Sequence, residues 1–225
     1  MDGNTKQKSK KRNHLLYDFV KLTGALPALI WMRPKVHYMT KKQKFKGGML
    51  VASNHTGFTD PIKCMLPLWY RRVNSLATAN LYDTKLKNWF FKQMHCIKVD
   101  KENFNMETFH QVTERLNQNK LVLIFPEGGI NAKSEHVMSF KSGAILMAHK
   151  TGKPVLPMYV SKQKKWWHRV HIIIGDPIDV SSMCGKMPTL QQLNEISAYV
   201  RKKEIELEEY YFNSLKKDKT IEKGE

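Results

Sequence analysis

The residues MLVASNHTGFTDP, 49–61, join an apolar run to a polar loop that carries His55 and Asp60, five positions apart. The apolar residues 49–53 predict a buried strand, and Asp60 followed by Pro61 predicts a helix start with the carboxylate as N-cap. An imidazole accepts a proton near neutral pH, and a carboxylate can fix its tautomer. A solvated histidine and a capping aspartate are the ordinary structural alternatives to this general base.

The composition predicts one domain in a reducing compartment. A chain of 225 residues with 41% hydrophobic residues can bury a substantial core. The three cysteines, Cys64, Cys96 and Cys184, form no CxxC pair and no His/Cys cluster at metal-ligand spacing. We therefore expect no metal site.

The charge indicates an anionic partner. There are 38 Lys and Arg residues against 20 Asp and Glu, a net charge of +18. Residues 1–50 hold twelve Lys or Arg and two Asp, a net charge of +10. Residues 1–13 are expected to form a disordered basic tail. Nucleic acid, lipid headgroups and an acidic carrier protein would each satisfy this charge.

The segment HLLYDFVKLTGALPALIWMR, 14–33, has apolar residues at helical spacing. Lys21 interrupts it, and only eleven uncharged residues follow before Arg33, whereas about 20 apolar residues are needed to span a bilayer. It also lacks the cleavage site of a signal peptide. We expect residues 14–34 to form an amphipathic helix on an anionic membrane surface, with an ordinary core helix as the alternative.

From residue 49 onward, strand and helix patterns alternate. Strands are predicted at 49–53, 75–79, 96–99, 121–125, 154–160 and 169–175, and helices at 61–70, 85–94, 105–120, 139–152 and 189–217. Strict alternation indicates an α/β fold, with a mostly parallel sheet covered by helices on both faces. The last predicted helix is rich in acidic and basic residues.

Two polar loops are expected at one edge of this sheet. The binding crevice of such a sheet lies outside the carboxyl ends of its strands. The loop with His55 follows one strand, and FPEGGIN, 125–131, follows the wholly apolar run LVLIF. Glu127, between a proline and two glycines, lies on a tight loop that a ligand can approach closely. In isolation Pro-Glu-Gly is a common turn, and the second polar loop is what favours a site.

Four motifs together resemble one known family. NHTGFTD, 54–60, resembles the NHx4D motif of the glycerolipid and lysophospholipid acyltransferases, and FPEGG, 125–129, resembles their FPEG motif. FKSGAILMAHKTGKPVLPMYV, 140–160, resembles their Phe-Lys-x-Gly-Ala helix and the following strand, and IGDPI, 174–178, resembles their Gly-acid-Pro-Ile. The resemblance covers about residues 35–180. It implies a glycerolipid acyltransferase-like domain at 35–225.

The resemblance also implies a reaction. His55 would be the general base on an acceptor hydroxyl, and Asp60 would fix its tautomer. The acyl group would come from acyl-CoA or acyl-carrier protein as co-substrate, with no cofactor. The chain has no Gly-x-Ser-x-Gly elbow, so direct transfer is simpler than an acyl-enzyme. The residues implied to bind the acceptor are Phe125, Pro126, Glu127, Gly128 and Gly129.

Two arginines that are common in the family are absent. FPEG usually continues Thr-Arg-Ser, whereas here it continues Gly129-Ile130-Asn131, and the other arginine position falls at Lys101. Lysine offers a point charge where arginine offers a bidentate fork for phosphate. An isoleucine and a lysine at these positions weaken the expectation of a phosphomonoester acceptor. The lysines that could substitute are Lys101, as an acceptor-binding residue, and Lys141 or Lys133, as phosphate contacts; surface solvation is the alternative, and it is favoured for Lys133.

The expected function is acyl transfer to a lysophospholipid hydroxyl, in the first place that of 1-acylglycerol 3-phosphate, giving phosphatidate. The enzyme would be peripheral on the cytoplasmic face of a membrane, without a full transmembrane helix. One alternative is an acceptor without phosphate, such as an aminolipid or a secondary metabolite. A basic polyanion-binding protein is the alternative of another class. It would give His55 no role, and the motifs predict no nucleic-acid partner.

Overall fold

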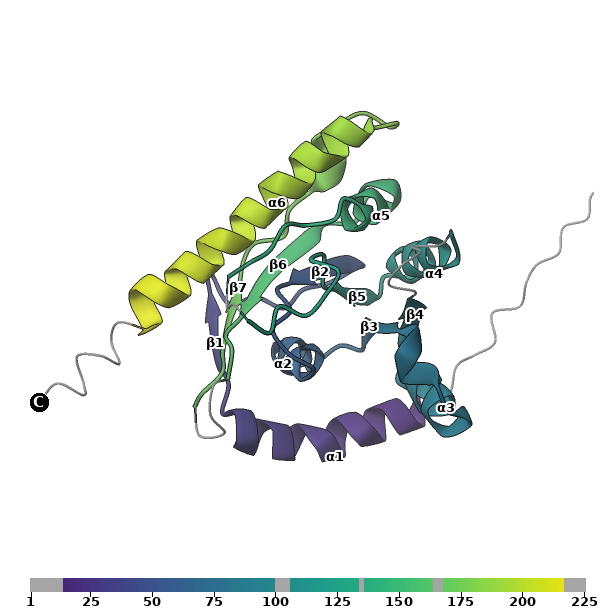
Figure 1. Ribbon diagram of the computed structural model, residues 1–225, viewed down its shortest axis with the longest axis vertical. Helices are drawn as coiled ribbons and strands as arrows, with labels where there is room; N and C mark the ends of the chain where they lie inside the picture. The colour runs from purple at the N-terminus through teal and green to yellow at the C-terminus, as the bar shows by residue number, and fades with distance from the viewer. Residues whose placement is uncertain (1–13, 100–105, 134–135, 164–167, 217–225) are drawn as a thin grey trace, which may run out of the picture.

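The computed structural model describes residues 14–99, 106–133, 136–163 and 168–216 (Figure 1). Its seven-stranded sheet has the order β1-β7-β6-β2-β5-β3-β4. The strands are β1 Lys35–Tyr38, β2 Met49–Ser53, β3 Val73–Thr78, β4 Ile97–Val99, β5 Leu121–Ile124, β6 Val155–Val160 and β7 His171–Ile174. Only β6 and β7 pair antiparallel in this sheet of described residues. The predicted mostly parallel sheet is confirmed.

The helices agree with the predicted ones except at their ends. They are α1 Leu15–Met32, α2 Asp60–Met65, α3 Lys85–Gln93, α4 Met106–Asn117, α5 Gly143–Thr151 and α6 Leu190–Tyr210. Short 3-10 turns lie at Leu66–Leu68, Ala79–Tyr82 and Val180–Ser182, and a π-helical turn at Tyr211–Lys216 follows α6. α5 begins four residues later than predicted, because Lys141 N bonds to Pro126 O instead of joining the helix.

Alternate residues of the central strands face opposite sides of the sheet. Leu50 and Ala52 pack in a core with residues of α4, α5 and α6. Met49 and Val51 pack in a second core with Met32 of α1 and with residues of α2 and the turn after it. Successive side chains of a strand point to opposite faces, so a strand buried on both sides must be apolar throughout. The predicted helices on both faces are confirmed (Figure 1).

The register of the central strands brings the two polar loops together. β2 lies between β5 and β6, with Ala52 opposite Ile124 and Ser53 opposite Met158. The side chain of Asn54 then extends the pairing beyond the strand end. Its Nδ2 donates to Val160 O at 3.0 Å, and its Oδ1 accepts from Val160 N at 2.8 Å. This pair of bonds fixes the start of the loop that carries His55.

The helix α1 runs along one side of the domain and is bonded to it at both ends (Figure 1). Tyr17 Oη accepts from Val73 N at 2.9 Å, and Asp18 accepts from Arg72 at 2.5 and 2.9 Å. At the other end, Met32 is fully buried, and its carbonyl accepts from Val170 N at 3.0 Å. By length and composition, α1 is the one helix among the described residues that could cross a membrane.

Candidate active site

His55 and Asp60 meet within one short loop. His55 Nδ1 lies 3.2 Å from Asp60 Oδ2. The same oxygen accepts from the backbone N–H of Thr56 at 2.6 Å and of Gly57 at 2.7 Å. The aspartate is fully buried, whereas the histidine is partly exposed. The loop therefore closes around the carboxylate and leaves the imidazole accessible.

The expectation that Asp60 is an N-cap was wrong. α2 begins at Asp60 itself, and Thr59, which precedes it, makes no side-chain capping bond. The carboxylate turns back towards the loop and accepts N–H groups that come before the helix. Pro61 does lie in the first turn, as predicted. Asp60 therefore organises the loop instead of closing the helix end.

The structure adds a residue that was not predicted, Lys63. Its Nζ donates to Asp60 Oδ1 at 2.8 Å, and its side chain is only 3% exposed. Burial raises the pKa of the Asp60 carboxyl. The hydrogen bond from His55 and the charge and hydrogen bond of Lys63 outweigh burial, so the pKa of this carboxyl lies below its usual range. An ionised carboxylate only accepts hydrogen bonds, so the proton between the two groups lies on His55 Nδ1. Nε2 is then the nitrogen that can accept a proton.

The FPEGG loop lies against the His55 loop. The ring of Phe125 stacks on His55, with ring centroids 4.0 Å apart and an interplanar angle of 15°. Asn131 N donates to His55 O at 2.7 Å. Gly128 has φ +75° and donates its N–H to Phe125 O at 3.1 Å, which closes a tight turn that only glycine adopts easily. The two loops thus form one site at the carboxyl ends of β2 and β5.

Glu127 is buried under this site. It is 6% exposed, and its Oε1 accepts from Met138 N at 3.2 Å. Its Oε2 has no hydrogen-bond partner among the described residues. Burial raises the pKa of the Glu127 carboxyl above its usual range, although the hydrogen bond from Met138 opposes the shift. The sequence predicted a carboxylate on an approachable loop, whereas this side chain points into the protein.

The candidate acceptor-binding residues are not equally accessible. Lys141 is exposed, and its Nζ would lie 2.8 Å from a Cβ added to Gly128, so the ammonium lies directly over that glycine. A Cβ added to Gly129 would meet open space. Pro126 is buried and bonds through its carbonyl to Lys141 N at 2.9 Å. Lys101 lies outside the described residues.

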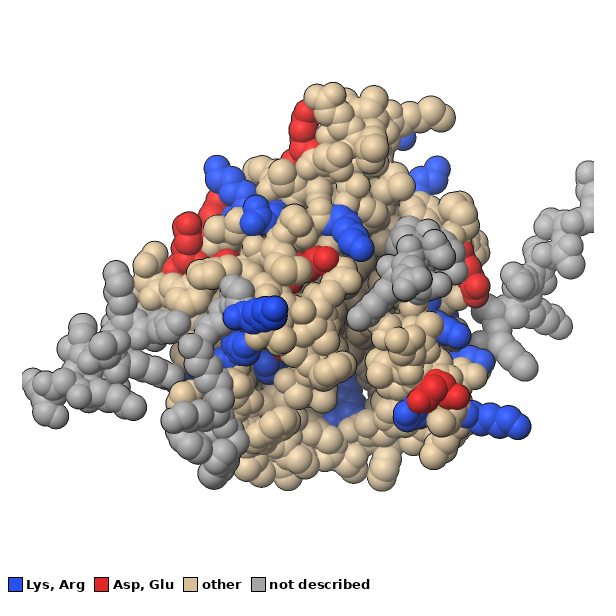
Figure 2. Space-filling model, in the orientation of Figure 1, with Lys and Arg blue, Asp and Glu red and all other residues tan. Residues whose placement is uncertain are grey.

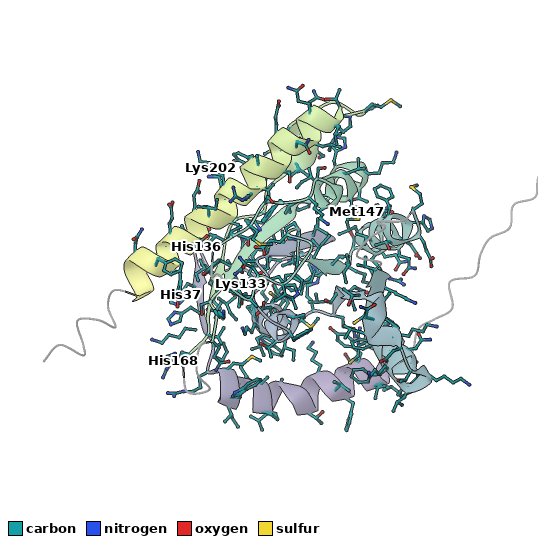
Figure 3. The ribbon with its side chains drawn as sticks, viewed as in Figure 1. His37, Lys133, His136, Met147, His168 and Lys202 are labelled. Atoms are coloured by element: carbon teal, nitrogen blue, oxygen red, sulfur yellow. The ribbon has the colours of Figure 1, made fainter. Side chains whose placement is uncertain are left out.

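Residues 136–138, which follow the FPEGG loop in the chain, are held by α6. His136, labelled in Figure 3 beside α6, contacts the carboxylate of Glu208. Arg201 donates to the carbonyls of Val137 and Met138 at 3.1 and 2.7 Å. α6 also carries Glu204, which is fully buried and whose two oxygens have no hydrogen-bond partner among the described residues. These long-range contacts leave no short motif in the sequence, so they were not predicted.

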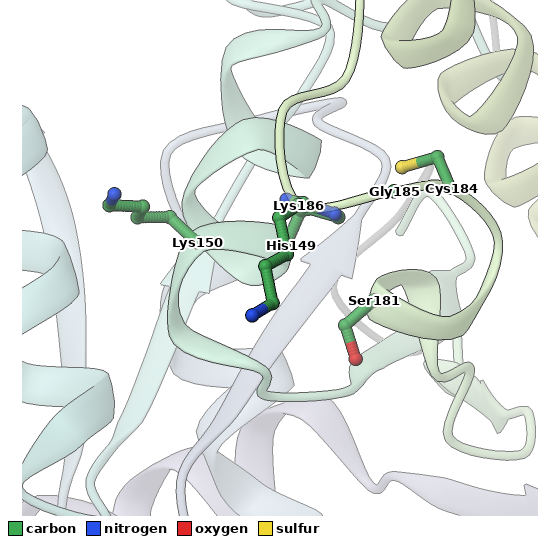
Figure 4. Close-up of a pocket in the computed structure, with 6 residues that line it drawn as sticks. All are labelled: His149, Lys150, Ser181, Cys184, Gly185 and Lys186. Atoms are coloured by element: carbon green, nitrogen blue, oxygen red, sulfur yellow. The ribbon is translucent and has the colours of Figure 1, made fainter.

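A separate hollow of about 480 Å³ lies between the end of α5 and residues 181–186 (Figure 4). It is lined by His149, Lys150, Ser181, Cys184, Gly185 and Lys186. His149 and Lys150 end α5, which leads into the beginning of β6, whereas the His55 loop lies at the other end of β6. This hollow is therefore not part of the site.

The surface does not have the charge distribution that is typical of a nucleic-acid binder. Lys and Arg side chains are spread over the face in Figure 2 instead of gathered in one stripe. A nucleic-acid binder usually shows a continuous basic patch.

In the described part of the chain, no group of three His, Cys, Asp or Glu side chains could hold a metal ion.

The chain is similar to known acyltransferases. Residues 33–161 match the family described as Acyltransferase. The 1-acyl-sn-glycerol-3-phosphate acyltransferase of Bacillus subtilis (strain 168) is 23% identical over 191 residues, which are 82% of this chain and 94% of that protein. A probable 1-acyl-sn-glycerol-3-phosphate acyltransferase of Mycoplasma pneumoniae is 27% identical over 124 residues, 51% of this chain and 45% of that protein.

A solved structure shows the same fold. The 1-acyl-sn-glycerophosphate (LPA) acyltransferase PlsC from Thermotoga maritima superposes with a TM-score of 0.63 and 20% identity, covering 86% of this chain and 79% of that one. The family match spans more than half of the 225 residues, and it includes both polar loops. The chain therefore belongs to the glycerolipid acyltransferases of the Acyltransferase family and is an O-acyltransferase.

Proposed function

We propose that this protein transfers a fatty acyl group from a thioester to the free hydroxyl of 1-acylglycerol 3-phosphate, giving phosphatidate. The observation that carries the proposal is the His55–Asp60 pair, 3.2 Å apart, stacked on Phe125 of the FPEGG loop. Two relatives that bear the name of this activity support the choice of acceptor. The donor is acyl-CoA or acyl-carrier protein, because both present the same thioester.

In the proposed mechanism His55 is the general base. Asp60 holds the proton on Nδ1, so Nε2 takes the proton of the acceptor hydroxyl as its oxygen attacks the thioester carbonyl. The new ester C–O bond forms, and the C–S bond breaks. The thiolate then takes the proton back from Nε2 and leaves as the free thiol. A positioned base contributes about 10²–10⁴-fold to such a rate.

The acceptor binds over the FPEGG loop in this proposal. Gly129 borders open space, and the Lys141 ammonium lies over Gly128, so a phosphate can meet a positive charge beside small residues. Lysine would here replace the arginine that Ile130 does not supply. Because the Glu127 carboxyl is buried, Glu127 supports the loop that binds the acceptor and does not contact the acceptor itself. Lys101 remains a proposed acceptor contact on the sequence alone.

The enzyme works at a membrane surface in this proposal. α1 bears an exposed apolar row of Leu15, Phe19, Leu22, Leu26 and Ile30. Phe58, which lies between the two candidate catalytic residues, is 83% exposed. Because α1 is bonded to the domain at both ends, it lies along the surface more readily than it crosses the bilayer. Substrate lipid would then reach His55 from the side that α1 and α2 share.

The test is thiol release from palmitoyl-CoA and from palmitoyl-carrier protein. The acceptors are 1-acylglycerol 3-phosphate, the corresponding monoacylglycerol and a set of aminolipids. We expect release with the phosphate acceptor and a loss of about 10²–10⁴-fold in kcat for His55→Ala. A folded His55→Ala variant with full activity would contradict the proposed base.

The phosphate contact is tested by Lys141→Ala. We expect a KM for 1-acylglycerol 3-phosphate at least about tenfold higher, since a charge-assisted bond to phosphate is lost. Lys150→Ala is the matched control, because Lys150 is also exposed and lies at the far end of α5. Release only with an acceptor that lacks phosphate would favour the alternative function, for which Ile130 in place of arginine is the supporting observation.

A further inference from the structure

Asp60 divides its two oxygens between two different tasks. Oδ2 accepts from His55 and from the N–H groups of Thr56 and Gly57. Oδ1 accepts from Lys63 Nζ at 2.8 Å. The bond from Lys63 is therefore about as short as the bonds from the loop N–H groups, but it is made to the other oxygen of the carboxylate.

The Lys63–Asp60 ion pair is buried inside the protein. The lysine side chain is 3% exposed and the aspartate side chain is 0% exposed. A lysine is rarely buried so completely, because its ammonium must leave water. Two charges in a site of low dielectric interact strongly with any third charge nearby. The third charge here is the one that His55 gains when it accepts a proton.

We propose that Lys63 is a positioning residue of the transfer reaction, which holds Asp60 through Oδ1 and, by its charge, sets the pH range in which His55 accepts a proton. The inference rests on the proposed function of His55. Without Lys63, the protonated histidine would face an aspartate with a whole negative charge. With Lys63, that negative charge is already balanced, so protonation of His55 leaves the group with a net positive charge.

The other titratable groups around this cluster come from three elements. Glu127, on the loop after β5, is near enough for the charge of His55 to oppose the larger effect of burial on the pKa of the Glu127 carboxyl. Glu204 of α6 lies behind Glu127, and burial raises the pKa of both carboxyls above their usual range. Cys64 of α2 is fully buried, and burial raises the pKa of its thiol to about 12, so it carries no charge near neutral pH. Among the described residues that contact Asp60, Lys63 is thus the one with a fixed positive charge.

The experiment compares pH–rate profiles of the full chain with palmitoyl-CoA and 1-acylglycerol 3-phosphate. Lys63→Gln keeps a hydrogen-bond donor but removes the charge, whereas Lys63→Met removes both. In both variants we expect the acid side of the kcat/KM profile to move about one pH unit towards higher pH, because a cation near His55 has gone. Lys203→Met is the matched control. Lys203 pairs with Glu206 three residues away at 2.9 Å, but on the surface of α6.

A purely structural lysine would give a different result. It would lower the rate equally at every pH, and Lys63→Gln would recover the wild-type profile; either result overturns the proposal. If the single variants do not fold, Lys63→Arg, which keeps the cation, is assayed instead. Its acid side should coincide with that of the wild type, and a shift of about one pH unit would overturn the proposal.

The wild type and His55→Ala are assayed first in the same series. Absence of thiol release by the wild type, or full activity of His55→Ala, would remove the proposed function and this inference with it. An active wild type, an inactive His55→Ala and unshifted Lys63 profiles would overturn the inference alone.

Discussion

Asp60 shows how much of the site depends on one side chain. It accepts two backbone N–H groups, the imidazole of His55 and the ammonium of Lys63. A carboxylate that satisfies several donors holds a loop in one conformation, and its ionised form is favoured by each of them. The same contacts that order the loop therefore also decide which nitrogen of His55 is free. Structure and proposed chemistry are not separable at this residue.

Gly48, which precedes β2, has a purely steric role. A Cβ at this position would lie 2.2 Å from the carbonyl oxygen of Leu116 in α4. That oxygen belongs to the backbone and cannot move aside as a side chain can. We expect Gly48→Ala to lower the free energy of unfolding by about 1–3 kcal/mol, measured by urea denaturation. Gly185→Ala, where a Cβ meets open space, is the control and should be unchanged; equal stability of both variants would contradict this reason.

α6 is the element that holds residues 136–138, the segment that follows the FPEGG loop. Glu208 accepts from Val137 N at 3.1 Å and contacts His136, and Arg201 binds two carbonyls of the same segment. Glu204 lies on the same helix, fully buried. Burial first, and then the nearby Glu127, raise the pKa of the Glu204 carboxyl well above its usual range. The position of Glu204 on α6 therefore favours the uncharged form of this acid.

This raised pKa predicts a pH dependence of stability. The folded protein holds the Glu204 proton more tightly than the unfolded chain does, so the stabilisation is complete below the ordinary pKa of about 4.5 and is lost as the pH rises. Relative to Glu204→Gln, the wild type should become less stable between pH 5 and pH 8. Thermal unfolding at several pH values measures the difference.

The control for this measurement is Glu209→Gln, a change on the same helix at an exposed position. It should leave the difference from the wild type constant across the same range. Parallel curves for wild type and Glu204→Gln would mean that Glu204 keeps its charge in the folded protein.

Considered as a whole, the molecule places α1 and the His55 loop on one side of the sheet. Met32 of α1, Cys64 of α2 and Leu68 share a core there, while α4, α5 and α6 cover the other face. The apolar row of α1 is exposed, whereas Tyr17 and Met32 of the same helix are buried. An amphipathic helix held in this way can bury its exposed row in a lipid surface while the domain stays outside.

The membrane contact is tested with the variant Phe19→Gln/Leu22→Gln/Leu26→Gln of the full chain. The three side chains are exposed, so thermal unfolding should be unchanged. Partition into anionic vesicles of phosphatidylglycerol and phosphatidylcholine should fall by about 1,000-fold or more, since each of the three buried apolar side chains contributes about 1.5–3 kcal/mol. Met187→Gln/Leu190→Gln, at exposed positions near the start of α6, is the control. Equal sedimentation of both variants would remove α1 from the contact.

Much of this protein could be read from local patterns. The strands from 49 to 175 and the helices from 61 to 217 were predicted to within a few residues, because hydrophobic periodicity is a property of neighbouring residues. β1 was not predicted, since four half-exposed edge residues show no clear alternation. The two motifs that meet in the site were also found, because each is continuous in the sequence and each follows an apolar strand.

The remaining features depend on how the folded chain packs around each side chain. That Asp60 faces the loop instead of capping α2, that Lys63 is buried beside it, and that Glu127 points inward each follow from packing. The pairing of Glu208 with a segment 71 residues earlier depends on the position of α6 over the sheet. Burial and charge balance are sums over many neighbours, so no short stretch contains them. The sequence was sufficient for the family and its two motifs, but the electrostatic state of the site required the fold.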